Sequence, residues 1–255
     1  MRMTRFQIRR RSVDHTALVR WAGGAGIAGS LLYALGDALL LGSKIEPDKH
    51  PILHEPDVKP EIGSMLPAST TRLTAGAMCG VFGAPLYLAA AWHLYEGLAP
   101  AGKARALPPA LLLAGAWTTP AFIHGTFFHW GEAYKIAEEL APTSEEAKQR
   151  LLRQANDFGR AIAIAYWPFG IATVAASALT IAAVATGRTA YPRWAGPLVA
   201  PALPIAAASV VSGQHHLPGP AKHLMQGAGI SLGHLISYGA STALLWSGRR
   251  LRAAR

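Results

Sequence analysis

Charged residues and cysteines are both scarce in this sequence, and each shortage argues against a class of protein. Asp, Glu, Lys and Arg make up 15% of the 255 residues, and hydrophobic types make up 51%. A soluble domain carries about 25% charged residues. The single cysteine, Cys79, cannot form a disulfide within the chain. The sequence therefore favours a protein that lies in a lipid bilayer over a soluble domain, and over a domain held together by disulfides within the chain.

The charge-free stretches are long enough to cross a membrane. Residues 161–187, for example, contain no Asp, Glu, Lys or Arg. A helix of about 20 apolar residues matches the thickness of the hydrocarbon core. The sequence predicts an all-α integral membrane bundle of six transmembrane helices at 19–42, 73–97, 107–134, 161–187, 194–213 and 223–248. This transmembrane domain, 19–248, lies between a basic segment, 1–18, and a basic tail, 249–255.

The distribution of Lys and Arg predicts the orientation. Fourteen of the 24 basic residues lie at the termini or in the connections that share their side. The other basic residues are mixed with most of the acidic ones in two long connections. Because Lys and Arg accumulate on the cytoplasmic side, we expect both termini in the cytoplasm of a multi-pass cell-membrane protein. The basic leader is then an anchor for anionic lipid, and nucleic acid is not an expected partner.

The two long connections differ in character. Residues 43–72 are rich in Pro and mixed in charge, which predicts an external loop. The connection 135–160 has a cap candidate at Thr143 or Ser144 and apolar residues at helical spacing. It predicts an external amphipathic helix at about 143–160, lying on the membrane surface or over the bundle.

Two features of the second predicted span are expected to be structural. Gly76 and Gly80 lie four residues apart, a spacing that lets helix backbones approach closely. His93 lies near the cytoplasmic end of the same span, where we expect it to anchor at the membrane interface.

Several catalytic sequence motifs are absent. There is no glycine-rich phosphate loop, no nucleophile elbow, no CxxC pair and no Asp-rich diphosphate motif. These absences argue against nucleotide chemistry and magnesium-dependent prenyl transfer.

Polar residues instead gather toward the outer ends of the predicted spans. Asp37 lies near the end of the first span, and "AFIHGTFFHWGEAY" (121–134) places His124, His129 and Glu132 in the outer half of the third. His234 lies inside the last span. Ionisable groups in hydrocarbon are costly and normally face a partner, water or the bundle interior. Their convergence on one leaflet predicts a polar site, although each residue alone could be an interfacial or solvated side chain.

The spacing of the histidines gives little support for zinc. His124 and His129 are about 140° apart on a helical wheel, with Glu132 between them in angle, and no HExxH motif is present. A zinc site would need ligands from several helices. The possible ligands are His124, His129, His215 and His234, with Asp37 as a further contributor.

Three segments resemble an uncharacterised family of bacterial polytopic membrane proteins with six spans, which implies a bacterial inner-membrane location. They are "YALGDALLLG", "STTRLTAGAMCGVFGAPLYLAAAWHLYEGL" and "AFIHGTFFHWGEAYK". In that family a Gly-Asp ends the first span and an F-I-H-G element lies in the third. The resemblance covers the first half of the chain and points to Asp37, Arg72 and His124, but it implies no reaction.

Taken together, these features predict a buried polar pocket that acts on a lipid-like or isoprenoid-like molecule. We expect acid–base chemistry such as isomerisation, cyclisation or hydrolysis, with metal-assisted chemistry as the less favoured form. Asp37 or Glu132 is the expected acid or base, with His124 and His129 orienting, protonating or ligating. The expected substrate-binding residues are Arg72, Asn156, Asp157, Tyr166 and His234. A transporter or small-ligand binder is the first alternative, and an accessory protein that binds a partner is the second.

Overall fold

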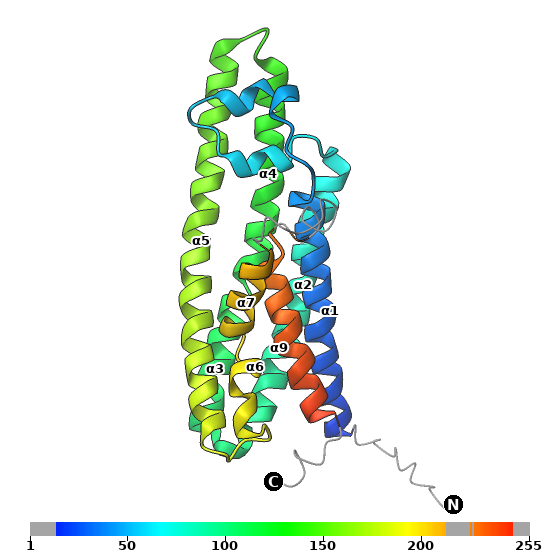
Figure 1. Cartoon of the computed structure of the whole chain (residues 1–255), viewed down its shortest axis with the longest axis vertical. Helices are drawn as coiled ribbons and strands as arrows, with labels where there is room; N and C mark the ends of the chain where they lie inside the picture. Colours follow the sequence, from blue (N-terminus) through cyan, green and yellow to red (C-terminus); the bar gives the residue numbers. More distant parts are fainter. Residues whose placement is uncertain (1–13, 213–224, 226, 247–255) are drawn as a thin grey trace, which may run out of the picture.

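The computed structural model describes residues 14–212, 225 and 227–246, and this part of the chain is helical without strands. The helices form an elongated bundle (Figure 1). They are α1 (His15–Leu41), α2 (Thr70–Leu98), α3 (Lys103–Ala116), α4 (Thr119–Leu140), α5 (Glu145–Ala185), α6 (Gly196–Val199), α7 (Ala202–Ser212) and α9 (Gly229–Leu245). Short 3₁₀ turns lie at Pro47–Lys49, Pro51–His54, Pro60–Ser64, Ala99–Ala101 and Arg193–Ala195.

The first residues of three long helices explain where those helices begin. Asp14, Ser69 and Ser144 are the N-caps of α1, α2 and α5, and each side chain accepts a hydrogen bond from a backbone N–H in the first turn. Such caps satisfy donors that have no partner within the helix. The cap predicted at Thr143 or Ser144 is confirmed at Ser144.

Four helical lengths are long and apolar enough to cross a membrane within the described residues. They are His15–Leu41, Thr70–Ala101, Lys103–Leu140 and Glu145–Ala185. The pair Arg193–Val199 and Ala202–Ser212, bent by 52°, becomes a fifth if it crosses as one broken span. The bend falls at Pro201, which cannot continue the backbone hydrogen bonding of α6. The predicted sixth span, 223–248, contains α9, a helix of 17 residues.

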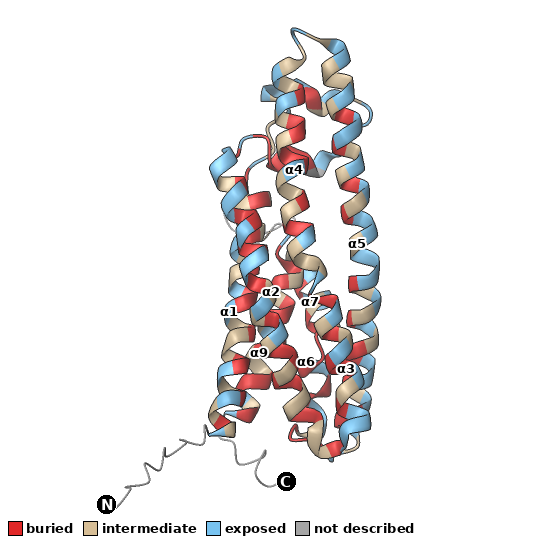
Figure 2. Cartoon of the chain, turned by 180° about the vertical axis from the view of Figure 1, so that it is seen from behind, coloured by how far each residue is buried: buried red, intermediate tan, exposed pale blue. Residues whose placement is uncertain are grey.

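The surface of the bundle is also that of a membrane protein. Ile164, Trp167, Ile171 and Val174 are each more than 60% exposed along the outward side of α5, the side that is pale blue in Figure 2. A contiguous apolar surface of this kind marks a membrane or protein contact. At the end where α1 starts and α9 finishes, Trp21, Trp194 and Trp246 are exposed, as expected for an aromatic belt at the bilayer boundary.

The longest helix differs from the sequence prediction. α5 runs without a break through 41 residues, a length of about 61 Å against a hydrocarbon core of about 30 Å. The expected separate helix at 143–160 is therefore wrong, because it is the first part of the same helix as the predicted span 161–187. Gly159, the one residue there that could weaken the helix, packs against the Trp130 ring. With α4, this part of α5 forms a hairpin that projects beyond α1 and α2 (Figure 1).

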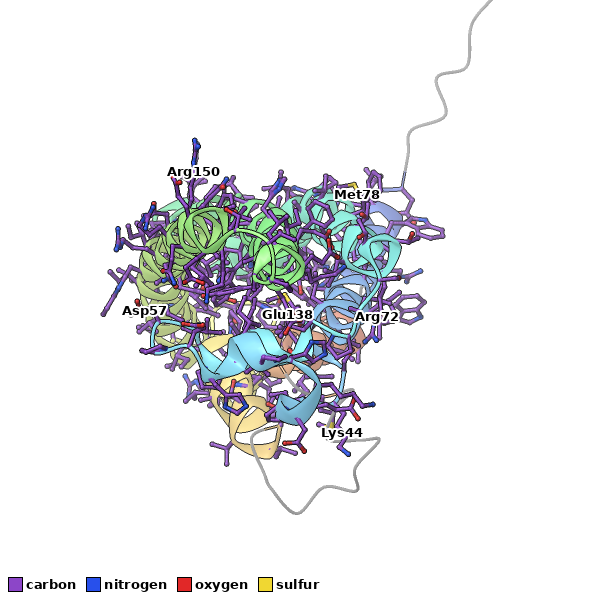
Figure 3. The ribbon with its side chains drawn as sticks, turned by 90° about the horizontal axis from the view of Figure 1, so that it is seen from above. Lys44, Asp57, Arg72, Met78, Glu138 and Arg150 are labelled. Carbon is purple, nitrogen blue, oxygen red and sulfur yellow. The ribbon has the colours of Figure 1, made fainter. Side chains whose placement is uncertain are left out.

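The connection between α1 and α2 is folded against that hairpin. Ile52, Ile62 and Met65 join a buried cluster with Tyr134 and Leu152. Two ion pairs add to this contact, one between His50 and Glu138 at 2.8 Å and one between Glu55 and Lys148 at 2.8 Å. In Figure 3, which looks down the long axis, Glu138 lies between α4 and this connection. The external loop predicted at 43–72 thus packs into a hydrophobic core that it shares with α4 and α5, and it ends where α2 begins at Thr70.

Candidate functional site

A cavity inside the bundle brings together polar side chains from three helices. Asp37 comes from α1, His124 from α4, and Ser231 and His234 from α9. About 430 Å³ in and around the cavity is free of protein atoms, open solvent included, but only about 40 Å³ can hold the centres of water molecules. The latter is room for a few waters, at about 10–15 Å³ each. The cavity can therefore hold a small polar group together with water.

Asp37 is the centre of the polar contacts. The Ser231 hydroxyl donates to Asp37 Oδ2 over 2.6 Å. His124 Nε2 lies 3.5 Å from Asp37 Oδ1, and the two side chains are 8% and 14% exposed, respectively. On the other side of the imidazole, His124 Nδ1 faces the carbonyl oxygen of Gly76 at 3.4 Å. The carboxylate therefore has one close hydroxyl partner and one imidazole at the outer limit of hydrogen bonding.

These neighbours define which proton can move. A backbone carbonyl only accepts, so the position of Gly76 favours a hydrogen on His124 Nδ1. One further proton on this pair can lie either on the Asp37 carboxyl or on His124 Nε2, whose atoms are 3.5 Å apart. Both arrangements leave the pair with no net charge, which lowers the cost of burying it. The geometry is that of a proton donor and acceptor facing each other in a largely buried site.

Small residues explain how His124 reaches Asp37 between α1 and α2. A Cβ at Gly80 would meet the Cβ and Cγ of His124, and one at Gly36 would lie 3.1 Å from His124 Cε1. A Cβ at Gly76 would approach Leu40 Cγ to 2.7 Å. The predicted packing role of Gly76 and Gly80 is therefore confirmed, and for Gly80 the packed side chain is a site residue.

Aromatic rings form the floor of the cavity, toward the end where α1 begins. The Tyr33 and Tyr87 rings stack with centroids 5.0 Å apart, and the Tyr33 ring lies edge-on to His124 at 5.0 Å. The His234 ring contacts Tyr87 at 5.2 Å and Trp117 at 5.6 Å. Tyr33, Tyr87 and Trp117 are buried. These rings fill the bundle beneath the polar groups and separate them from the opposite end.

Asp37, His124, His234 and Tyr166, all predicted as site residues, line this cavity. Tyr166 stands at its edge, because its side chain is 38% exposed. It also borders an apolar groove on the surface of α5. This residue therefore connects the interior cavity to the outer face of the bundle.

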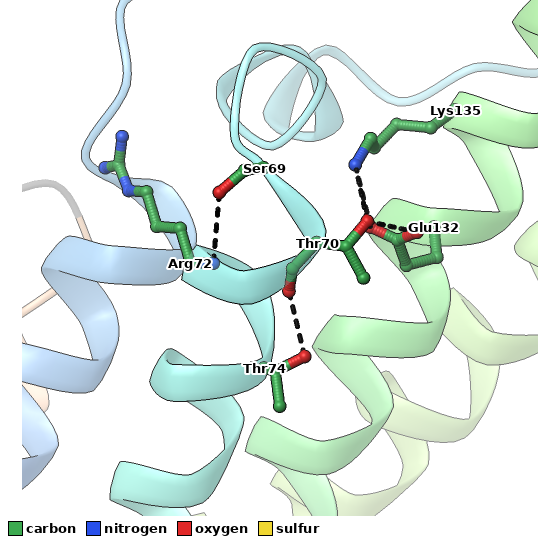
Figure 4. A network of polar contacts seen from close by, with 6 residues as sticks. All are labelled: Ser69, Thr70, Arg72, Thr74, Glu132 and Lys135. Carbon is green, nitrogen blue, oxygen red and sulfur yellow. Dashed lines mark hydrogen bonds and ion pairs between the residues drawn. The ribbon is translucent and has the colours of Figure 1, made fainter.

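Glu132 and His129, predicted with the same group, lie elsewhere. Glu132 forms an ion pair with Lys135 at 2.8 Å and accepts hydrogen bonds from the Thr70 hydroxyl, so it joins α4 to the first turn of α2 (Figure 4). His129 is exposed, and its ring packs against Phe158. Neither Glu132 nor His129 lines the cavity that contains Asp37, because tertiary neighbours outside it occupy both side chains, and their catalytic role stays a prediction.

Three further residues predicted to bind substrate have structural partners outside the cavity. Arg72 donates to the Ala38 carbonyl at 2.9 Å, near the end of α1. Asn156 accepts from the Tyr134 hydroxyl at 2.9 Å, and Asp157 pairs with Arg160 on the exposed side of α5. None of the three lines the cavity that contains Asp37, and their role in substrate binding stays a prediction.

The proposed zinc ligands are not assembled in the described part of the chain. No group of three or more His, Cys, Asp or Glu residues there is placed to hold a metal ion. His124 has Asp37 as its carboxylate neighbour, whereas His129 points to an aromatic ring. His215 lies outside the described residues.

Sequence reasoning missed the role of one buried histidine. His93, expected to anchor at the interface, is fully buried, with Nδ1 2.7 Å from the Val19 carbonyl and Nε2 2.8 Å from the Ser241 hydroxyl. The Tyr191 hydroxyl is 2.7 Å from the same Ser241 oxygen. This network joins α1, α2 and α9 at the end opposite Asp37. The spacing of Tyr33 and Asp37, four residues apart on one helical face, could have indicated that Tyr33 lies beside the site. No feature of the sequence indicates that His93 contacts Ser241.

Comparison with known proteins assigns this chain to a protein family. The chain matches no curated protein and no solved structure. A family model described as "Family of unknown function (DUF6796)" matches residues 17–247. The matched residues include Asp37, His124 and His234. The chain belongs to this family of unknown function, DUF6796.

Proposed function

We propose that this protein is a membrane-embedded acid–base catalyst that acts on a lipid-like or isoprenoid-like molecule. The observation that carries the proposal is the buried pair of Asp37 and His124, 3.5 Å apart beside a cavity, with Ser231 bound to the other carboxylate oxygen. A carboxyl and an imidazole that exchange one proton can remove a proton from one atom of a substrate and return it to another. Isomerisation and cyclisation need one proton removed and one returned, so the substrate gains or loses no net proton.

The proposed orientation places the site in the outer leaflet. We take the bent pair of α6 and α7 as the fifth crossing and α9 as the sixth, with both termini in the cytoplasm. The loading of Lys and Arg at the termini and the exposed Trp21, Trp194 and Trp246 at that end support this orientation. Asp37 is four residues from the last residue of α1, about 6 Å below the outer end of the helix.

Access from the bilayer is the proposed route for the substrate. Tyr166 borders both the cavity and the groove on the lipid-facing side of α5. A substrate that enters beside Tyr166 would not have to cross water. This route also agrees with the small volume near Asp37, which accommodates a reacting group and leaves the remainder of the molecule outside.

The test compares matched carboxylate variants in nanodiscs loaded with the lipid extract of the host membrane. Incubation in D₂O, followed by mass spectrometry, reports deuterium incorporated into a lipid by proton transfer. We expect conversion by the wild-type protein, a loss of about 100-fold or more in Asp37→Asn and His124→Gln, and no loss in Glu132→Gln. Undiminished conversion by a folded Asp37→Asn variant would refute the acid–base role.

Binding without turnover is the second candidate function, favoured by the small space for water in the cavity. It predicts that a lipid copurifies with the wild-type protein but acquires no deuterium. Transport is less favoured, because the Tyr33, Tyr87 and Trp117 rings fill the bundle between the cavity and the other end. An accessory role would rest on the projecting hairpin, and it predicts that variants of Asp37 behave as wild type.

A further inference from the structure

We infer that the ligand of this cavity is a single-chain amphiphile with an uncharged oxygen head, a hydroxyl or a carbonyl, held at His234, and with its apolar chain along α5. The inference rests on the proposed function only in taking the same cavity as the binding site. It adds the chemical class of the head, the residue that holds it and the path of the chain. Three independent features of the cavity support it.

The first feature is the unsatisfied imidazole of His234. This side chain lines the cavity and is 1% exposed. Neither ring nitrogen has a hydrogen-bond partner within the described residues, and the nearby Ile230 carbonyl does not reach hydrogen-bond geometry. Buried polar groups are nearly always bonded, because an unmatched donor or acceptor is costly. A neutral imidazole presents one donor and one acceptor, and a hydroxyl can satisfy either of them.

The neighbour of His234 has the same deficiency. The indole N–H of Trp117 is buried without a partner among the described residues, and its ring contacts the His234 ring edge-on. Trp117 itself does not line the cavity, so the donor that a ligand meets there is the imidazole N–H of His234. An alkylammonium head has no acceptor, so it would leave this donor unmatched. An oxygen atom with free lone pairs is the head that this end of the cavity requires.

The second feature is the charge of the lining. No Lys or Arg lines the cavity within the described residues, and Asp37 is the acidic residue that does. A phosphate or carboxylate head would be buried beside the Asp37 and His124 pair, which has no net charge to offset it, and this is strongly unfavourable. Arg72 does not supply a counter-charge, because it does not line the cavity. The lining therefore disfavours anionic lipids and selects an uncharged head.

The third feature is the groove on α5. Ala163 and Gly170 leave a hollow along the helix, and Trp167, Ile171 and Val174 form its apolar wall. Tyr166 belongs to both the groove and the cavity. From Ala163 to Val174 the groove extends for about 16 Å at the rise of an α-helix. A single alkyl or isoprenoid chain fits this length, while the head enters beside Tyr166.

The experiment measures retention of three probes that share one chain and differ in the head. Purified protein in nanodiscs is incubated with radiolabelled tetradecanol, tetradecylamine or tetradecyl phosphate, and empty nanodiscs give the background. We expect saturable, stoichiometric retention of the alcohol alone. His234→Leu should weaken it by about 10-fold, the loss of one hydrogen bond. Gly170→Leu, which fills the groove at a position with no neighbour within 4 Å, should weaken it as well.

Two control variants carry the same amino-acid change at a position outside the proposed site. Gly239→Leu also has no neighbour within 4 Å and lies on α9 away from the groove, so retention should be unchanged. His129→Leu removes an exposed histidine and should have no effect. Equal retention of all three probes by the wild-type protein, or preferred retention of the amine or the phosphate, overturns the inference without reliance on any variant.

The outcomes also separate this inference from the proposed function. If the alcohol binds but no lipid acquires deuterium, the ligand class stands and catalysis fails. If an Asp37-dependent conversion occurs while the alcohol is not retained, catalysis stands and the ligand class fails. Retention that is unchanged in both His234→Leu and Gly170→Leu places the alcohol elsewhere and overturns the assignment of the site.

Discussion

Substitution of Gly80 by Ala tests the packing that brings His124 to Asp37. A Cβ at Gly80 would overlap the Cβ and Cγ of His124, atoms too close to the backbone to rotate away. To restore ordinary contact, α2 and α4 must separate by about 1 Å, and overpacking of this kind costs about 1–3 kcal/mol. For a chain of this size the cost corresponds to a fall in Tm of about 2–12 °C.

The control for this prediction is the same substitution at the neighbour of His124. A Cβ at Gly125 would have no other atom within 4 Å, so Gly125→Ala should leave Tm unchanged or raise it slightly. Unfolding is followed by near-UV circular dichroism in detergent. A double variant, Gly80→Ala with His124→Gly, should recover stability beyond the sum of the single effects. Equal Tm values for Gly80→Ala and Gly125→Ala would refute the proposed close contact.

Three further predictions concern other parts of the molecule. His93→Ala removes two buried hydrogen bonds, to the Val19 carbonyl and to the Ser241 hydroxyl, and should cost about 2–4 kcal/mol of unfolding free energy. His129→Ala at an exposed position should cost less than about 0.5 kcal/mol; equal costs in a detergent unfolding titration would contradict this. Glu138→Ala frees His50 and the Ile52 N–H and should increase tryptic cleavage of residues 43–69 by about 5–10-fold; an unchanged rate would show that the ion pair does not hold this connection. In a variant without the native cysteine, an impermeant maleimide added to intact spheroplasts should label Glu145→Cys but not Lys103→Cys; the reverse pattern would invert the proposed orientation.

The sequence predicted the apolar bundle well because the thickness of a bilayer fixes the length of an apolar helix. The first two predicted spans, 19–42 and 73–97, lie within α1 and α2 with only small changes at their ends. The continuity of α5 was not predictable from the polarity change near residue 160. Polarity reports what surrounds a helix, whereas continuity depends on the backbone, and no proline interrupts the chain between Glu145 and Pro168.

The sequence predicted some of the side chains that line the cavity. The differences between that prediction and the structure have one physical origin. The cost of burying ionisable groups directed attention to Asp37, His124 and His234, which line one cavity. The helical wheel placed Glu132 between two histidines in angle, but angle does not tell which neighbouring helix lies there. The sequence does contain a sign that Glu132 and Asp157 are already paired. Lys135 lies three residues after Glu132, and Arg160 three residues after Asp157, so each ion pair forms along one helix. Such local pairing indicates a side chain that is already satisfied.

The buried histidines of this protein differ in how their nitrogens are satisfied, and that difference separates structure from function. Both nitrogens of His93 are bonded to protein, so any new bond there would break an existing one. Both nitrogens of His234 are unmatched in the described part of the chain, which leaves a cost that Leu at this position would remove. We therefore expect His234→Leu to be at least as stable as the wild-type protein while it loses the alcohol. A protein that keeps a destabilising side chain beside its cavity fits a binding site maintained for its ligand.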